Sequence, residues 1–346
     1  MTLIDGSVAP ARRSSDFTEL SRAIKQRGLL DRRRGNYILR FAVNATLMAT
    51  GWTAFALLGS SWWQMLTAVF FAVAFAQLAF LGHDAGHKQI FRSRRANDVV
   101  GYLNGAVVGL SYQWWVGKHT RHHANPNHED EDPDIDIPLL AFSHEQAAAK
   151  RGVMRWMTKY QAYLFFPLLL LEGLSLHYSS IRAVLRREVK ANRLEAALLA
   201  THVVGYLAAV FWVLSPLQAI AFIAVHQGLW GLYMGCSFAP NHKGMPTMSA
   251  GEKVDHLRKQ VLTSRNVRGG RIVDIALGGL NYQIEHHLFP SMPMANLRHA
   301  QPLVREFCTR IGIPYHQTSA LGSYAQVLRH LHAVGAPLRA AAQTPA

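Results

Sequence analysis

The sequence predicts an all-α membrane protein with four transmembrane helices that pair as two hairpins. Three observations predict this class. Four stretches of nearly a bilayer's length contain no charged residue, and basic residues gather at the same ends of both hairpins. In addition, only 16% of the 346 residues are charged, while 50% are hydrophobic. That charge content is low for a soluble domain.

The four uncharged stretches define the transmembrane helices. A membrane-spanning helix needs about 20 predominantly apolar residues, and each stretch has nearly this length. The first two are joined by Gly59, Ser60 and Ser61, and the last two by Ser215, so each pair forms a hairpin. The predicted spans are residues 41–58, 62–81, 196–214 and 216–236.

The distribution of basic residues predicts the orientation. Neither hairpin joint contains Lys or Arg, whereas the opposite ends of the hairpins carry many. By the positive-inside rule these ends and both termini face the cytoplasm. The basic residues are Arg32, Arg33, Arg34 and Arg40 before the first span, Lys88, Arg92, Arg94 and Arg95 after the second, and Arg182, Arg186, Arg187 and Arg193 before the third.

Two further apolar stretches are ambiguous. Residues 99–117 are uncharged, but glycines recur there every four positions, as on faces where helices pack closely. Residues 161–171 are short for a span and contain Pro167. We expect an interfacial or re-entrant helix at both places. The Ala-rich sequence from Ala333 is expected to fray.

Composition excludes several other classes. The hydrophobic content excludes a disordered chain. Two cysteines, Cys236 and Cys308, exclude a disulfide scaffold and a cysteine-ligated metal cluster. The first 37 residues have no apolar core, so no cleavable signal is expected.

Histidines carry the chemical signal. The chain has 18, and several fall in short clusters with the spacing of ligands on one helix face. In the predicted topology every cluster lies on the cytoplasmic side. The clusters are His83 and His87; His119, His122 and His123; Gln283, His286 and His287; and Asn241 with His242.

The number of clustered histidines predicts two metal ions. Eight imidazoles exceed the three or four protein ligands of one zinc ion. Imidazole suits zinc, copper, iron and nickel, so ligand type does not choose among them. The chain must cross the membrane an even number of times between the second and third clusters if they are to meet, and the two hairpin spans satisfy this. The sequence therefore predicts a cytoplasmic helical cap that holds a histidine-rich dimetal site.

Three motifs carry a family resemblance. HDAGH at 83–87, HTRHH at 119–123 and QIEHHLFP at 283–290 resemble the three histidine boxes of the integral-membrane fatty acid desaturases, in the variant with Gln in the third box. The sequence shows no heme motif of a fused cytochrome b5, so a member of the bacterial type without that domain is expected. The resemblance implies a desaturase domain over residues 41–305, between a basic cytoplasmic segment at 1–40 and a cytoplasmic tail at 306–346.

The resemblance also implies the chemistry. A histidine-ligated di-iron centre would use O2 to remove two hydrogens from a fatty acyl chain held in an apolar tunnel, leaving a cis double bond. The implied catalytic residues and iron ligands are His83, His87, His119, His122, His123, His286 and His287, with His242 as a further ligand. Gln283 and Asn241 are implied to lie at the centre, and Asp84 and Glu285 to orient ligand histidines, which usually donate their other N–H to a carboxylate.

The remaining polar residues have simpler interpretations. The acidic run at 129–136 is expected to be a solvated loop, although the carboxylates of residues 132–136 are also candidates to orient ligand histidines. His202 and His226, inside spans, are expected to make hydrogen bonds between helices. Other histidines, including His128, His177 and His330, are expected at the surface. Trp114 and Trp115 fit either the substrate tunnel or an interfacial aromatic belt.

Desaturation needs two electrons, and the sequence contains no nucleotide-binding glycine motif, cysteine cluster or heme motif. An external donor is therefore expected, with ferredoxin and its reductase first and cytochrome b5 second. The net charge of +15 would attract an acidic donor, the lipid bilayer's anionic headgroups or the phosphates of CoA. No motif supports nucleic-acid binding.

Two alternatives stay open. A hydroxylase or ketolase would use the same boxes. A histidine-lined metal transporter would place its ionisable groups near mid-membrane rather than at span ends. The sequence predicts a multi-pass protein of the cell membrane, but not the double-bond position, the acyl chain length, the acyl carrier (CoA, acyl carrier protein or phospholipid) or the oligomeric state.

Overall fold

The computed structural model describes residues 15–249 and 251–340. Residues 1–14 and 341–346, which belong to the predicted N-terminal segment and C-terminal tail, lie outside it. The chain forms two compact units. The hairpin unit comprises residues 32–117 and 167–236, and the globular unit comprises the described parts of residues 1–31, 118–166 and 237–346.

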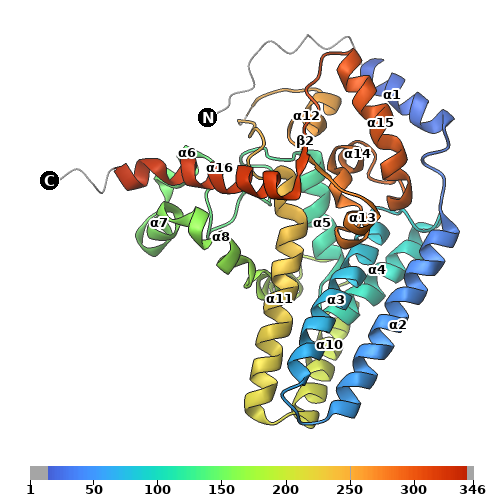
Figure 1. The fold of residues 1–346 in the computed structure, drawn as a ribbon, viewed down its shortest axis with the longest axis vertical. Helices are drawn as coiled ribbons and strands as arrows, with labels where there is room; N and C mark the ends of the chain where they lie inside the picture. The colour runs from blue at the N-terminus through green and yellow to red at the C-terminus, as the bar shows by residue number, and fades with distance from the viewer. Residues whose placement is uncertain (1–14, 250, 341–346) are drawn as a thin grey trace. The chain divides into compact units, whose positions relative to one another are not determined.

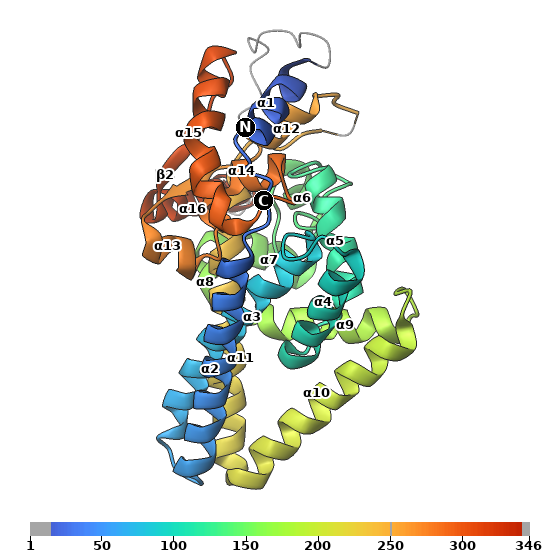
Figure 2. The same ribbon diagram turned by 90° about the vertical axis from the view of Figure 1, so that its right-hand side faces the viewer.

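The hairpin unit is built from long helices. Figures 1 and 2 show α2 and α3 side by side and joined at one end, as in the first predicted hairpin. The elements of this unit are α2 (Arg34–Leu58), α3 (Gln64–Gly86), α4 (Arg94–Val108), the first half of α5 (Tyr112–Ala124), α9 (Glu172–Leu185), α10 (Asn192–Val213) and most of α11 (Pro216–His242).

Four of these helices, α2, α3, α10 and α11, are long and apolar enough to cross a membrane. This confirms the predicted all-α membrane class and its four spans. The helices extend beyond the uncharged stretches. α2 begins at Arg34 and α10 at Asn192, so both include charged residues ahead of the predicted spans, whereas α11 continues to His242 through six further residues without Lys, Arg, Asp or Glu. Long basic side chains at a helix end can reach water while their stems stay among apolar groups, so charge does not terminate the helix.

The two ambiguous stretches are not straight spans. α8 (Gln161–Leu169) and α9 are bent by 69° at a short break, as in a broken span or a re-entrant loop. Residues 99–117 break between α4 and α5, where Gly109 has a left-handed φ of 76°. A Cβ on Gly101 would lie 2.2 Å from the Tyr112 ring, so this glycine lets α5 pack directly on α4.

The globular unit has its own apolar core. Ile24, Val261, Ile284 and Val304 are fully buried together and come from four different helices. The elements of the unit are α1 (Ser15–Gln26), the second half of α5, α6 (His144–Ala149), α7 (Gly152–Lys159), most of α8, the end of α11, α12 (His256–Leu262), β1 (Asn266–Arg268), α13 (Arg271–Ala276), the 3-10 helix η1 (Leu280–Tyr282), α14 (Gln283–Leu288), α15 (Met294–Arg310), β2 (Gln317–Ser319) and α16 (Ala320–Ala340).

The C-terminal region belongs to this core. β1 and β2 pair in parallel with Asn266 opposite Gln317. The predicted boundary at residue 305 falls inside α15. The expected fraying from Ala333 is wrong, because α16 continues to Ala340 and buries Val334 and Leu338 against Ala141 and Ala147.

Candidate metal centre

The first histidine pair lies at the end of α3 in the hairpin unit. The helix continues through the motif, so His83 and His87 share one face and their ring centroids are 4.7 Å apart. The Trp115 ring lies 5.5 Å from that of His83. Gly86 makes room for this indole, since a Cβ there would lie 2.5 Å from it. Trp115 therefore packs beside the first box.

Asp84 lies next to His83 but is held mainly by α2. Its carboxylate is buried, accepts a hydrogen bond from the Tyr37 hydroxyl at 3.1 Å, and pairs with Arg40. His83 Nδ1 is 3.5 Å from Asp84 Oδ1, at the outer limit of a hydrogen bond. The carboxylate proposed to orient His83 is thus itself fixed by two residues, Tyr37 and Arg40, that the sequence did not assign to the site.

The globular unit gathers six of the eight clustered histidines. His119, His122 and His123 come from the last turns of α5, His286 and His287 from α14, and His242 is the last residue of α11. His122, His242, His286 and His287 are buried. Segments more than 100 residues apart in sequence therefore bring their imidazoles together within this one unit.

Three of these histidines direct one nitrogen toward a common point. The ligand atoms of His122, His242 and His287 all lie within 4.8 Å of one another, and the Nε2 atoms of His122 and His242 are 3.3 Å apart. We call these residues the trio. The Nδ1 of each histidine is hydrogen-bonded to an oxygen outside the trio. His122 Nδ1 is 3.0 Å from Asp132 Oδ1. His242 Nδ1 is 2.9 Å from the Thr263 carbonyl, and His287 Nδ1 is 2.8 Å from Gln260 Oε1.

This pattern fits a bound cation. A carboxylate or carbonyl oxygen only accepts, so each Nδ1 carries the hydrogen and each Nε2 presents a lone pair. Lone pairs that face one another at these distances repel unless a cation lies between them. An all-nitrogen set is typical of zinc, copper, iron or nickel rather than of calcium or magnesium. The residues of the trio therefore fit a transition-metal ion.

Asp132 corrects the prediction for the acidic run. Asp132 is 1% exposed rather than solvated, and it accepts hydrogen bonds from His122 and from the Asn127 amide at 2.7 Å. Although burial acts to raise the pKa of Asp132, the hydrogen bond from His122 holds that pKa below its usual value. The anionic form is thus favoured beside the imidazole, as a carboxylate that orients a metal ligand requires.

The other histidines of the unit lie next to the trio. His119 Nε2 is 3.1 Å from His123 Nε2, and the rings of His123 and His286 are 4.8 Å apart. The His123 ring also stacks on His287 at 4.1 Å. The second and third boxes therefore meet through their histidines.

Gln283 and Asn241 form a pair beside His242. The Gln283 amide nitrogen is 2.8 Å from His242 Nε2, and its oxygen accepts a hydrogen bond from Asn241 Nδ2 at 3.3 Å. Asn241 Oδ1 is buried and makes no hydrogen bond with the described residues. Asn241 Nδ2 also donates to the Ser237 carbonyl at 3.1 Å, so both of its hydrogens face acceptors and the Gln283 NH2 is fixed toward His242.

The Glu285 carboxylate is hydrogen-bonded to two residues outside the histidine boxes. Its carboxylate accepts from Asn266 Nδ2 at 2.7 Å and from the Tyr315 hydroxyl at 2.8 Å. Asn266 Oδ1 also accepts the Ile284 amide at 2.9 Å. Burial raises the pKa of Glu285 to about 7. These contacts hold α14, the helix that carries the third box, against β1.

Sequence reasoning missed Gln260, Thr263 and Asn266, which lie outside every box and follow no spacing rule. It also misplaced the three histidines named above as surface groups. His128 is 6% exposed, His177 is partly buried and donates to the Gly109 carbonyl at 2.8 Å, and His330 is partly buried and donates to the Phe142 carbonyl at 3.0 Å. His202 donates to the Ala106 carbonyl at 3.1 Å, and His226 bonds the Tyr206 hydroxyl at 2.8 Å, so both link helices as expected.

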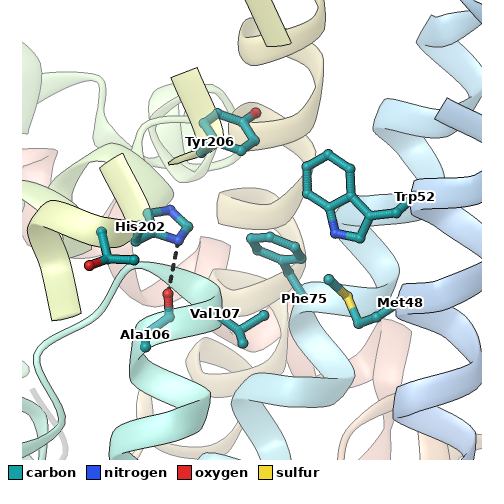
Figure 3. A pocket seen from close by; sticks show the side chains of 8 residues that line it. Met48, Trp52, Phe75, Ala106, Val107, His202 and Tyr206 are labelled. Atoms are coloured by element: carbon teal, nitrogen blue, oxygen red, sulfur yellow. Dashed lines mark hydrogen bonds between the residues drawn. The ribbon is translucent and has the colours of Figure 1, made fainter. Parts of the chain in front are cut away.

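The hairpin unit also contains a cavity of about 220 Å³. Figure 3 shows aromatic and apolar side chains around it, with His202 hydrogen-bonded to Ala106 at one side. The walls come from α2, α3, α4 and α10. The lining residues are Met48, Trp52, Phe75, Ala106, Val107, Thr201, His202 and Tyr206. Such a mostly apolar lining suits an uncharged, hydrophobic group.

Comparison with known proteins decides the family. The family model for fatty acid desaturases matches residues 60–319. The chain belongs to the fatty acid desaturase family. This confirms the resemblance drawn from the histidine motifs, and the members of this family are oxidoreductases.

Curated relatives agree with this family. An acyl-lipid (9-3)-desaturase of Physcomitrium patens is 31% identical over 92% of this chain and 62% of the relative. A delta(8)-fatty-acid desaturase of Helianthus annuus is 27% identical over 92% of this chain and 72% of the relative. The delta(6)-fatty-acid desaturase fat-3 of Caenorhabditis elegans is 30% identical over 94% and 76%, respectively. The chain thus spans less than two thirds of the Physcomitrium patens relative.

Proposed function

We propose that this protein is an oxygen-dependent desaturase of the cell membrane that introduces a cis double bond into a fatty acyl chain. Its metal centre would hold two iron ions. The proposed ligands are His83, His87, His119, His122, His123, His242, His286 and His287. When bound, the irons would supply the oxidising power, with O2 as co-substrate, that removes two hydrogens from an unactivated CH2–CH2 unit.

The observation that carries the proposal is the trio. Its three Nε2 lone pairs converge, while three separate acceptors fix the opposite ring nitrogens. Preorganised ligands of this kind suit a catalytic metal more than a chance cluster. Membership of the desaturase family makes iron the metal to test first.

The chain's own residues would then divide the remaining tasks. Asp132, Thr263 and Gln260 hold the imidazoles in one tautomer. The apolar cavity between α2, α3, α4 and α10 offers a dry place for part of an acyl chain. Exclusion of water matters because a strong oxidant must react with the substrate rather than with solvent.

The proposal includes an external electron donor and a cytoplasmic site. Ferredoxin with its reductase is the first candidate and cytochrome b5 the second. The net charge of +15 favours an acidic donor protein. The substrate would be an acyl-CoA or a phospholipid acyl chain. The basic span ends support a topology with the metal centre and both termini in the cytoplasm.

The test is product analysis in cells. Cells that express the chain, with and without a ferredoxin and its reductase, would be grown in oxygen, and their fatty acids separated by gas chromatography after double-bond derivatisation. A new unsaturated species that needs both oxygen and the donor is expected. A hydroxylated product would instead assign a hydroxylase, and purified protein with exchangeable zinc and no new product would indicate a transporter.

A further inference from the structure

We propose that Gln260 is a positioning residue that sets how strongly His287 donates electrons to the metal. The inference rests on the proposed function, since it concerns the same centre. Gln260 lies on α12, outside all three histidine boxes, and is 0% exposed. Its side-chain amide joins the helices that carry the second and third boxes.

The two ends of this amide have different partners, and together they fix the protonation of His287. Gln260 Nε2 donates to the His123 backbone carbonyl at 2.9 Å. Because a carbonyl only accepts, the amide nitrogen must face it, and the amide oxygen must face His287 Nδ1, 2.8 Å away. That nitrogen therefore carries the hydrogen, and Nε2 of His287 keeps its lone pair for the trio.

α12 is itself firmly held, so Gln260 can impose this geometry. Asp255 caps the helix by accepting from the Arg258 amide at 3.2 Å. Leu257 and Val261 are buried in the core of the globular unit. Lys259 Nζ donates to Asn125 Oδ1 at 2.9 Å, just after the second box. The residue after the helix, Thr263, orients His242. One short helix and its C-cap thus serve two members of the trio.

The partners of the trio are chemically unequal. His122 donates to a carboxylate, His242 to a backbone carbonyl and His287 to a neutral amide. A carboxylate partner raises the basicity of an imidazole ligand more than a neutral oxygen does. Gln260 thereby keeps His287 a weaker electron donor than His122, and a charged residue in its place should favour the oxidised metal.

The experiment compares Gln260→Glu and Gln260→Leu with the wild-type protein, purified in detergent and loaded with iron. Both variants lose the bond to His123, and in Gln260→Glu an oxygen replaces the donor that faced the His123 carbonyl. The Leu variant is therefore judged by its iron affinity and the Glu variant by its midpoint potential. Gln260→Leu should bind iron 10–100-fold more weakly. Gln260→Glu should keep its iron. Its ratio of oxidised to reduced iron should rise about tenfold relative to wild type, which lowers the midpoint potential by about 59 mV for one electron.

Gln26→Glu adds the same charge at an exposed glutamine and should leave the potential unchanged. Wild-type iron affinity in Gln260→Leu, or a wild-type potential in Gln260→Glu, would overturn the proposal. If the Glu variant does not fold, iron affinity in the Leu variant decides alone. If the wild-type protein binds no iron, the proposed function fails, but the relative affinity of Gln260→Leu for cobalt(II), measured from its absorption, still tests Gln260.

Discussion

At the scale of single residues, hydrogen bonds decide which nitrogen of each imidazole is available to a metal. Asp132, the Thr263 carbonyl and Gln260 each accept a hydrogen bond from the Nδ1–H of one histidine. None of the three lies in a histidine box. The ligands would lose their common direction without these acceptors, because an imidazole exchanges tautomers freely in water.

Removing a member of the trio tests the site most directly. His122→Ala should abolish desaturation and lower the iron content, because one converging lone pair is lost, while the protein still inserts into the membrane. Product analysis, iron per chain and membrane fractionation measure these effects. His299→Ala, at an exposed histidine, is the matched control and should behave as wild type. Full activity in His122→Ala would refute the assignment.

Neutralising the partner of His122 is a milder change. Asp132→Asn keeps the shape of the side chain but removes the charge that holds the Nδ1 hydrogen. Iron affinity should fall 10–100-fold, the usual cost of removing such a partner. Competition with a chelator of known affinity would measure it. An unchanged affinity would mean that Asp132 serves only the loop through the Asn127 amide.

At the scale of elements, α14 depends on β1 for its place. Asn266 bonds the Ile284 amide and the Glu285 carboxylate, both buried. Asn266→Ala should destabilise the protein by about 1–3 kcal/mol for each buried group left without a partner. Thermal unfolding in detergent would measure this loss. A melting temperature equal to that of wild type would show that α14 is held by its apolar contacts alone.

Much of the helix pattern was predictable from the sequence, and the reasons lie in particular elements. Uncharged stretches of bilayer length predict α2, α3, α10 and α11 because lipid imposes their length. The break at Gly109 and the packed end of α16 could not be predicted from the sequence. They depend on contacts, such as Tyr112 on Gly101 and Val334 on Ala141, that no local rule contains.

In the candidate site, too, some features were predictable from the sequence and others were not. Histidine spacing predicts which imidazoles share a helix face, and the structure brings six of them together in one unit. Their orienting groups were not predictable, since Gln260 and Thr263 are ordinary polar residues until α12 is packed. Asp132 was misjudged for the same reason, because an acidic run usually means a solvated loop.

At the scale of the whole molecule, the four spans predict where each loop lies. Reporter domains inserted after Ser60 or Ser215 should be active only outside the cytoplasm, and a reporter fused after Ala346 only inside it. The basic residues at the other span ends impose this orientation. A cytoplasmic signal from either hairpin joint would contradict the topology, and with it the common side assigned to the histidine clusters.

The placement of α12 has a consequence for protein engineering. A designer who wished to transplant the trio into another helical scaffold could not move the histidine motifs alone. Residues 255–266 would have to be transplanted as well, because Gln260 and Thr263 of that segment orient His287 and His242, and Asn266 holds α14. The minimal set of segments that would reproduce this centre therefore includes one that contributes no proposed ligand.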